Sequence, residues 1–448
     1  MSVRKGAAHV DVCCPVGRCA AVASAPKGRI TMSTMGSETG RRTRLRRNSA
    51  RKQRSRGRTP PTTGPASRYR VQREDALDFL APEYTDLFDH SEATAFQHGA
   101  WLHRLYSSLA PRRGSLPCVV TVRDTVGDRL IAVLPLIRRR LGPLRLVEYA
   151  DLGVCDYAAA VVRTEHQEGV RADATLAPRI RRVLPAYDLL LVQRVPDSPE
   201  NVTSLIAGGR SNRHPYGAHL IELAGTVDGW RIALDPSFRR HLDRKYKRLR
   251  PKGGSRLRVV TDPTEVPAVM AALREFRRVR FAERGGTDLT QDPGYFDFYQ
   301  DVARDGVLGR GPARLTVLDV GNEPAAVALN LAEPRGEVYV LVGYDLHRLR
   351  NYSLGLLIVD QLARAVIERG EEYLDLTVGD EPYKSDFGAR RRQLFEVYAA
   401  RTPAGLALYS GRLAYLASRR TAKRTVVAWK SNWPKIRARF APGTVAKK

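Results

Sequence analysis

The clearest pattern of apolar and polar positions lies between residues 339 and 389. Residues 340–342 belong to a β-rich run, polar residues then interrupt it, and Ser353 is a typical N-cap for a following helix. Apolar residues recur from there at every fourth position, namely Leu354, Ile358, Leu362 and Val366. A second short apolar strand follows at residues 373–378. This order predicts a strand, helix, strand unit in which the helix N-terminus offers unpaired backbone N–H groups to an anion.

Two blocks of elements surround this unit. The first is expected to begin with a helix whose apolar face contains Trp101, Leu105 and Leu109, and to continue with strands at residues 116–122, 130–137, 144–162 and 189–195. The second is expected to contain helices at residues 238–249, 266–281 and 295–307, strands at 257–260, 315–320, 325–331 and 394–399, and the unit described above.

The two blocks share a hairpin with related turn chemistry. In one, Gly127 precedes Ala132-Val133 by five residues; in the other, Gly321 precedes Ala326-Val327 by the same spacing. A repeated supersecondary unit favours two similar domains. We therefore expect an α/β (α+β) fold of two tandem domains, each with a mixed, mainly antiparallel sheet flanked by helices, and a cleft between them.

Composition divides the chain into four segments. Residues 1–68 hold 16 Lys and Arg against 2 Asp and Glu, and are expected to be a disordered basic tail and linker. Residues 69–235 and 236–420 are the two expected domains, and residues 421–448 form a basic amphipathic tail.

The formal net charge of +28 is concentrated at the ends of the chain. The two tails carry +14 and +8, which leaves only +6 for residues 69–420. This distribution argues against a fold whose own surface binds nucleic acid, so no specific nucleic-acid partner is predicted. The tails are expected to contact polyanions or an anionic membrane non-specifically. The chain has no apolar run of about 20 residues and no signal-peptide core, which predicts a cytoplasmic protein, with peripheral membrane contact left open.

Metal and redox chemistry have no support in the sequence. The five cysteines and nine histidines lack the spacing of zinc ligands or of a disulfide framework, so we predict no metal site. Neither a Gly-x-Ser-x-Gly elbow nor a Walker loop is present, so the sequence does not support hydrolase or P-loop chemistry.

Three short motifs carry a resemblance to a known family: residues 352–355 (Tyr-Ser-Leu-Gly), residues 379–384 (Gly-Asp-Glu-Pro-Tyr-Lys) and Phe387-Gly388. With the strand that precedes them, they resemble the C-terminal half of the CelD-like (cellulose-biosynthesis) acetyltransferases, a branch of the GNAT superfamily related to Fem-type aminoacyl transferases. The resemblance implies acyl transfer from acetyl-CoA or another acyl-CoA to a small-molecule, sugar or envelope-precursor amine. The family usually has Ser-Pro-Gly where this chain has Ser-Leu-Gly.

The resemblance and the local pattern together assign candidate site residues. The turn into the helix is expected to bind the coenzyme A pyrophosphate through Arg350, Asn351, Ser353, Leu354 and Gly355.

The motif after the second strand is expected to hold the reacting groups. Asp375, Asp380 and Tyr383 are the catalytic candidates, as base and as proton donor to the leaving thiolate, and Lys384 and Glu381 are the substrate-binding candidates. Each has a plainer interpretation: Asp375 as the partner of an arginine, Asp380 and Glu381 as solvated turn residues, Tyr383 as a packing residue and Lys384 as a surface charge.

Two other functions stay open at this point. One is a Fem-like transferase that uses aminoacyl-tRNA, which the basic tails would serve. The other is a degenerate GNAT module that binds polyanions through its tails. The basic stretch at residues 239–258, with ten Lys and Arg, is either a solvated helix face or a platform for an anionic cofactor or substrate.

Overall fold

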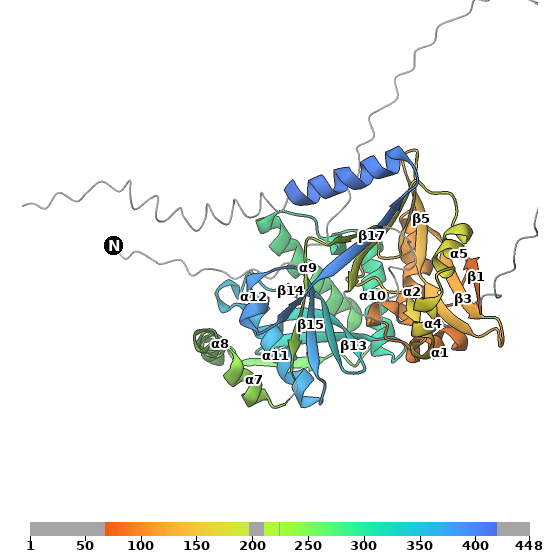
Figure 1. The fold of residues 1–448 in the computed structure, drawn as a ribbon. Helices are drawn as coiled ribbons and strands as arrows, with labels where there is room; N and C mark the ends of the chain where they lie inside the picture. Colours follow the sequence, from red (N-terminus) through yellow and green to blue (C-terminus); the bar gives the residue numbers. More distant parts are fainter. Residues whose placement is uncertain (1–67, 197–209, 224, 419–448) are drawn as a thin grey trace, which may run out of the picture. The chain divides into compact units, whose positions relative to one another are not determined.

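A computed structural model describes residues 68–196, 210–223 and 225–418, which form three sheets and their covering helices (Figure 1). The predicted tails, residues 1–68 and 421–448, lie outside the described residues apart from Arg68. No helix within the described ranges is long and apolar enough to cross a membrane.

A seven-stranded sheet builds the second half of the chain. Its strands lie in the order β11 (Ser255–Val259), β12 (Ala313–Val320), β13 (Glu323–Glu333), β14 (Gly336–Tyr344), β15 (Tyr373–Val378), β10 (Ala218–Glu222) and β16 (Arg390–Arg392). The neighbouring strands are antiparallel except for β14 and β15, which are parallel.

Helices cover both faces of this sheet. Alternate strand residues such as Val327 and Ala328 enter two different apolar clusters, as the two-residue period of a strand requires. One cluster contains side chains of α9 (Val266–Arg284) and α10 (Pro293–Val307), and the other those of α8 (Pro236–Leu249) and α11 (Leu354–Glu368). Shorter helices complete this half: α7 (Val227–Ala233), α12 (Pro382–Asp386), η4 (Arg250–Lys252), η5 (Leu289–Gln291) and η6 (Arg350–Tyr352).

Two smaller sheets build the first half. One has the order β1 (Tyr69–Glu74), β3 (Val119–Asp124), β4 (Leu130–Leu134) and β7 (Val161–Val162). The other has the order β2 (Leu116–Pro117), β5 (Leu136–Leu141), β6 (Leu144–Tyr149), β8 (Leu189–Pro196), β17 (Leu394–Ala400) and β9 (Arg210–Arg213). The helical segments are α1 (Pro82–Asp89), η1 (Ala95–Gln97), α2 (Gly99–Arg104), η2 (Leu105–Leu109), α3 (Ala110–Arg112), η3 (Thr164–His166), α4 (Gln167–Ala172) and α5 (Leu176–Val183).

The two halves exchange strands. β10 precedes the expected boundary at residue 235 yet pairs with β15 and β16, and β17 lies in the expected second domain yet pairs with β8 and β9. Figure 1 shows β17, in blue, running to the orange strands of the first half. The described residues all belong to one compact unit. The expected α/β (α+β) fold with tandem, mainly antiparallel sheets flanked by helices is confirmed, whereas the boundary between residues 235 and 236 stays a prediction.

The expectation of a continuous strand at residues 144–162 is wrong over residues 150–160. β6 ends at Tyr149, and Leu152 and Gly153 follow with positive φ angles of 44° and 83°. The Asp151 carboxylate accepts a hydrogen bond from the Gly153 backbone N–H at 2.8 Å, which closes a turn. This apolar run therefore forms a buried loop, which carries Asp156 and Tyr157 into the site described below.

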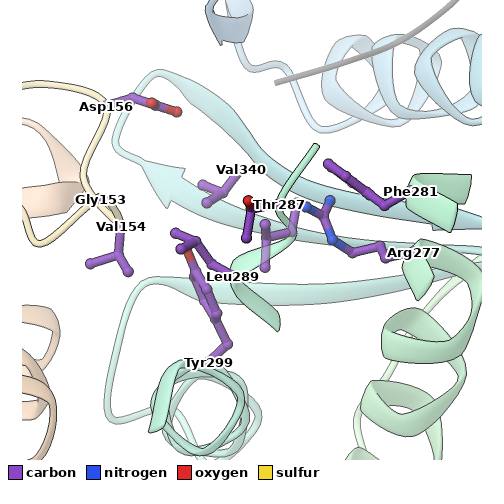
Figure 2. A pocket seen from close by; sticks show the side chains of 10 residues that line it. Gly153, Val154, Asp156, Arg277, Phe281, Thr287, Leu289, Tyr299 and Val340 are labelled. Atoms are coloured by element: carbon purple, nitrogen blue, oxygen red, sulfur yellow. The ribbon is translucent and has the colours of Figure 1, made fainter. Parts of the chain in front are cut away.

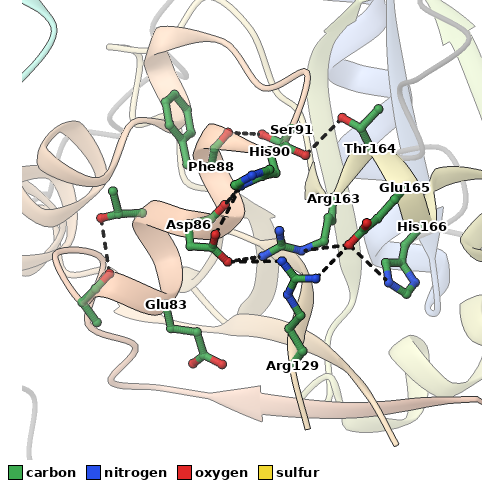
Figure 3. Close-up of polar contacts among 12 residues, drawn as sticks. Glu83, Asp86, Phe88, His90, Ser91, Arg129, Arg163, Thr164, Glu165 and His166 are labelled. Atoms are coloured by element: carbon green, nitrogen blue, oxygen red, sulfur yellow. Dashed lines mark hydrogen bonds and ion pairs between the residues drawn. The ribbon is translucent and has the colours of Figure 1, made fainter. Parts of the chain in front are cut away.

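A group of ion pairs secures α1 to the segment after β7 (Figure 3). The Arg163 side chain is 2% exposed and donates to Asp86 at 2.6 Å, and Arg129 pairs with Glu165 at 2.9 Å and with Asp86 at 3.7 Å. A buried arginine of this kind needs its carboxylate, because an unpaired charge in the interior is costly. We assign this group to the stability of the first half.

Candidate active site between strands β14 and β15

Strands β14 and β15 pair only where both begin. The register joins Gly336 to Tyr373, Glu337 to Leu374 and Val338 to Asp375, and the pairing stops there although both strands continue. Beyond this point the Thr377 hydroxyl spans the gap and donates to the Tyr339 carbonyl at 3.4 Å. The separation of two parallel strands in the middle of a sheet creates an opening where an extended ligand with amide groups can meet backbone donors and acceptors.

Helix α11 follows β14 after the connecting residues 345–353, so its N-terminus lies toward the C-terminal end of β14, where the two strands no longer pair. Ser353 occupies the N-cap with a left-handed φ of 58° and makes no side-chain capping bond; its carbonyl accepts from the N–H groups of Leu356 and Leu357. The first backbone N–H groups of a helix have no intrahelical partner and favour an anion, as does the helix dipole. Leu354 and Gly355, the first two helical residues, are buried in this turn.

Basic side chains of α8 surround the same turn. Lys245 and Arg248 donate to the Asn351 carbonyl at 2.8 and 3.4 Å, and the Arg248 guanidinium lies 5.0 Å from the Tyr352 ring centre. Burial lowers the pKa of Lys245, and the neighbouring positive charges of Arg248 and Arg244 lower it further. Arg350 forms an ion pair with Glu283. The five residues expected to bind the cofactor therefore lie together, and their binding role stays a prediction.

Asp375 lies at the point where the two strands separate and is buried. The Tyr157 hydroxyl donates to its carboxylate, with both oxygens at 2.8 Å, and the Thr377 backbone N–H donates to Oδ1 at 2.7 Å. Burial raises the pKa of Asp375 to about 6, although the two hydrogen bonds oppose the shift. Among the described residues its partners are thus a tyrosine and a backbone amide, and not the arginine of the plainer interpretation.

A second buried carboxylate comes from the first half of the chain. Asp156 precedes Tyr157 in the loop at residues 150–160, and Arg194 lies 3.5 Å from its Oδ1. The same guanidinium contacts Asp151 at 2.9 Å, so a single arginine serves two carboxylates. Burial raises the pKa of Asp156, and this is only partly opposed by Arg194, by a hydrogen bond with the Thr377 side chain and by the charge of Lys384.

Thr377 adopts a left-handed conformation with a φ of 57°, which is rare for a β-branched residue. Such strain costs on the order of 1–3 kcal/mol and persists only where neighbours hold it. The buried Lys384 side chain provides that support: its Nζ donates to the carbonyls of Thr377 and Val378 at 3.1 and 3.2 Å, and lies 3.2 Å from Glu381 Oε2. Two carbonyl oxygens thus accept hydrogen bonds from the ammonium group, and the Glu381 carboxylate supplies the opposite charge.

The other predicted residues occupy different surroundings. Asp380 is partly exposed and accepts from Arg391 at 2.9 Å, while Glu381 is buried beside the lysine described above. Tyr383 is buried in the apolar cluster on the α11 face, with its ring 6.5 Å from that of Phe387. The structure thus places Asp375 near the end of β15 and Tyr383 within the apolar cluster. The catalytic and substrate-binding roles of these residues stay predictions.

The sequence reasoning missed Asp156, Tyr157 and His219. The first two lie in an apolar run that was interpreted as a strand; an acidic residue between apolar neighbours, three positions after Gly153, was the available signal. His219 of β10 is buried with its Nε2 3.8 Å from Asp380, and burial, with a contribution from Lys384, lowers its pKa to about 4. Within the described ranges, no group of three or more His, Cys, Asp or Glu side chains could hold a metal ion.

Known proteins resemble this chain in sequence and in fold. Residues 236–385 match a family model described as acetyltransferase (GNAT) domain. No curated protein matches the sequence. The crystal structure of FemX shares the fold, with a TM-score of 0.52 and 12% identity over 76% of this chain and 99% of FemX.

Two further structures match with TM-scores below 0.5, and we base no argument on them. The C-terminal domain of a putative lysylphosphatidylglycerol synthetase from Agrobacterium fabrum has a TM-score of 0.45 and 13% identity over 73% of this chain and 95% of that one. A tandem GNAT protein from the clavulanic acid biosynthesis pathway has a TM-score of 0.41 and 14% identity over 75% and 99%. Residues 236–385 thus match a GNAT acetyltransferase domain, the chain shares its fold with FemX, and the CelD-like branch stays a prediction.

Proposed function

We propose that this protein transfers an acyl group from an acyl thioester of coenzyme A to an amine, at the opening between β14 and β15. The observation that carries the proposal is the end of strand pairing at Val338 and Asp375: a buried carboxylate marks the apex of the gap, and the N-terminus of α11 lies toward the C-terminal end of β14, where the strands no longer pair. The gap suits an extended chain with amide groups, and the helix N-terminus suits a pyrophosphate. The GNAT domain match supports the same class of reaction.

Each group at the opening between β14 and β15 has one task in the proposed acyl transfer. An amine must lose a proton before its nitrogen attacks the thioester carbon, and a carboxylate with a pKa of about 6 is ionised at pH 7 and able to accept that proton. The new C–N bond forms as the C–S bond breaks, and the second amine proton leaves with the thiolate. Tyr157 orients Asp375 through its hydroxyl, and we assign the stabilisation of the developing oxyanion to backbone N–H groups of β14 beyond Val338, where pairing with β15 has ended.

An aminoacyl-tRNA is the second candidate donor. Two observations favour it. The first is the fold shared with FemX. The second is the exposed basic face of α8, which extends beyond the turn at the N-terminus of α11 and is therefore larger than a pyrophosphate requires. That face includes Arg240, Arg244, Lys247 and Arg248. The bond broken would then be an ester to ribose in place of a thioester, with the same nucleophile and the same base.

Calorimetric titration of the full chain with acetyl-CoA, and separately with a charged tRNA, distinguishes the two donors. We expect saturable acetyl-CoA binding that weakens at least tenfold in Lys245→Gln, because this side chain contacts the turn at the helix N-terminus. Arg240→Gln removes the same charge at an exposed position of the same helix and is the matched control. Saturable binding of charged tRNA without acetyl-CoA binding would replace the first donor by the second. Binding of neither would leave a non-catalytic module.

A further inference from the structure

The loop at residues 150–160 supplies Tyr157, the hydrogen-bond partner of the proposed base. It contains no helix or strand, yet every residue from Val154 to Ala159 is buried. Figure 2 shows Val154 and Asp156 of this loop beside a small pocket whose other lining includes Val340 of β14. The backbone of such a loop has no neighbouring strand to pair with, so other groups must satisfy it and hold it in place. Those groups decide where the Tyr157 hydroxyl lies.

The three residues of the short helix η1 all take part in holding this loop. Ala95 donates its backbone N–H to Glu333 Oε1 of β13 at 2.7 Å, which attaches η1 to the seven-stranded sheet. Phe96 packs edge-to-face on the ring of Tyr157, with 5.9 Å between the ring centres. Gln97 donates from its side-chain amide to the Tyr157 carbonyl at 3.0 Å. η1 therefore contacts both the ring and the backbone of this tyrosine.

The Gln97 amide has a partner at each of its four hydrogen-bonding positions, although the residue is fully buried. Its Oε1 accepts from the backbone N–H and the hydroxyl of Thr94 at 3.0 and 2.8 Å. Its Nε2 donates to the Tyr149 hydroxyl at 2.8 Å and to the Tyr157 carbonyl. A backbone N–H only donates and a carbonyl only accepts, so these partners admit one orientation of the amide. The Tyr149 hydroxyl donates in turn to the Ala159 carbonyl at 3.2 Å, so the same amide ties the residue before the loop to residues near its end.

The position of the Tyr157 hydroxyl affects the proton affinity of Asp375. Its hydrogen bond and that of the Thr377 backbone N–H favour the ionised carboxylate and lower the pKa, against the larger effect of burial. Loss of the Tyr157 contact therefore raises the pKa, whereas displacement of the Glu333 charge together with η1 lowers it. The direction of a change thus separates the two causes. The charged and titratable groups around this pair are Glu333 of β13, Arg392 of β16, Tyr373 of β15 and Asp156 of the loop.

We propose that Gln97 is a positioning residue of the reaction centre, which fixes the backbone of Tyr157 so that its hydroxyl stays on the Asp375 carboxylate. Phe96 fixes the ring of the same tyrosine. This inference deepens the proposed function and rests on it for the role of Asp375 as the base. The hydrogen bonds themselves, and the proton affinity of the carboxylate, do not depend on turnover.

Urea unfolding of the full chain tests the inference without any donor or acceptor. The gain in stability from Asp375→Asn grows with pH and reaches its plateau near the pKa of the folded carboxyl, about 6; we call this pH the plateau pH. Gln97→Met keeps the length of the side chain and removes the amide. We expect it and Tyr157→Phe each to raise the plateau pH by about half a unit to one unit, and the double variant to raise it no further than Tyr157→Phe alone.

Tyr84→Phe is the matched control. It removes a hydrogen bond of 2.7 Å to the backbone carbonyl of Gln97 and leaves the side-chain amide in place, so the plateau pH should stay within about 0.2 unit of that of the wild type. A second variant keeps the test decisive if Gln97→Met does not fold. Gln97→Asn keeps an amide on a side chain one methylene shorter, and it should raise the plateau pH by at least about 0.3 unit.

An unmoved or lowered plateau pH in the glutamine variants, or a double variant whose shift is the sum of the two single shifts, overturns the inference. A protein that shows the expected shifts but transfers no acyl group retains the positioning of Tyr157 and loses the proposed function. A protein that transfers an acyl group but shows no shift in the glutamine variants retains the proposed function and loses this inference.

Discussion

Replacing Asp375 with asparagine should stabilise the fold at high pH while it removes the proposed base. The carboxyl pKa is raised from its ordinary value of 3.8 to about 6, mainly by burial. A shift of this size corresponds to roughly 3 kcal/mol, because each pKa unit is worth about 1.4 kcal/mol. The folded protein binds this proton more tightly than the unfolded chain. The favourable contribution is therefore complete below about pH 4 and is lost as the pH rises through 6.

Asparagine carries no charge at any pH and can keep the local hydrogen bonds. Its carbonyl can accept from the Thr377 backbone N–H, and its amide can donate to the Tyr157 oxygen after that hydroxyl turns. At pH 8 the Asp375→Asn protein should therefore be more stable than the wild type by up to about 3 kcal/mol, and the gain should shrink toward zero near pH 4. Turnover of a thioester with an amine acceptor should fall by roughly 10² or more.

Urea unfolding at pH 4, 6 and 8 measures the stability difference, and release of free thiol measures turnover. Asp380→Asn is the matched control, since that carboxylate is partly exposed and pairs with Arg391, and it should change stability by less than about 1 kcal/mol. A variant that is less stable than the wild type at pH 8, or whose gain does not depend on pH, would show that Asp375 is not the buried, proton-binding group described here. Undiminished turnover would remove it from the mechanism.

Three further variants address single contacts of the site. Tyr157→Phe removes a hydrogen bond that favours the ionised carboxylate, so the acid limb of the pH profile of kcat/KM should move up by roughly half a unit to one unit from its position near pH 6; an unmoved limb contradicts the contact. Lys384→Met should lower kcat at least tenfold with KM little changed, and adding Thr377→Gly should restore part of it in steady-state assays, because glycine adopts a positive φ without strain. No recovery in the double variant would mean that the lysine does more than hold this conformation. Gly355→Val should weaken calorimetric acetyl-CoA binding at least tenfold with a small change in melting temperature, and equal affinity would place the donor elsewhere.

The local order of elements was readable from the sequence because helix and strand periodicities are properties of consecutive residues. The four-residue repeat from Leu354 predicted α11, which runs from Leu354 to Glu368, and the apolar run at residues 373–378 is β15 with the same bounds. The two hairpins with related turns are β3 with β4 and β12 with β13. The short motifs at the C-terminal end then indicated a GNAT domain, and residues 236–385 match a GNAT domain model.

Strand pairing between distant segments was not readable in the same way. β17 has the pattern of a strand, and nothing in its own residues says that its partners are β8 and β9 in the first half. Backbone N–H and C=O groups are the same in every strand, so they do not select a partner strand. The partner is selected by how the side chains on each face of the sheet pack.

The chemistry of the site follows the same division. The sequence alone pointed to Asp375, because in an alternating strand its side chain lies on the face opposite to Leu374 and Leu376. Only the tertiary structure decided what surrounds it: Tyr157 comes from a loop 218 residues away, and Lys384 is turned inward to hold the strained end of β15. A pKa is set by burial and by the groups that meet in space. For that reason the sequence by itself determined the elements and the candidate base, and the fold decided its partners, its proton affinity and the pocket beside it.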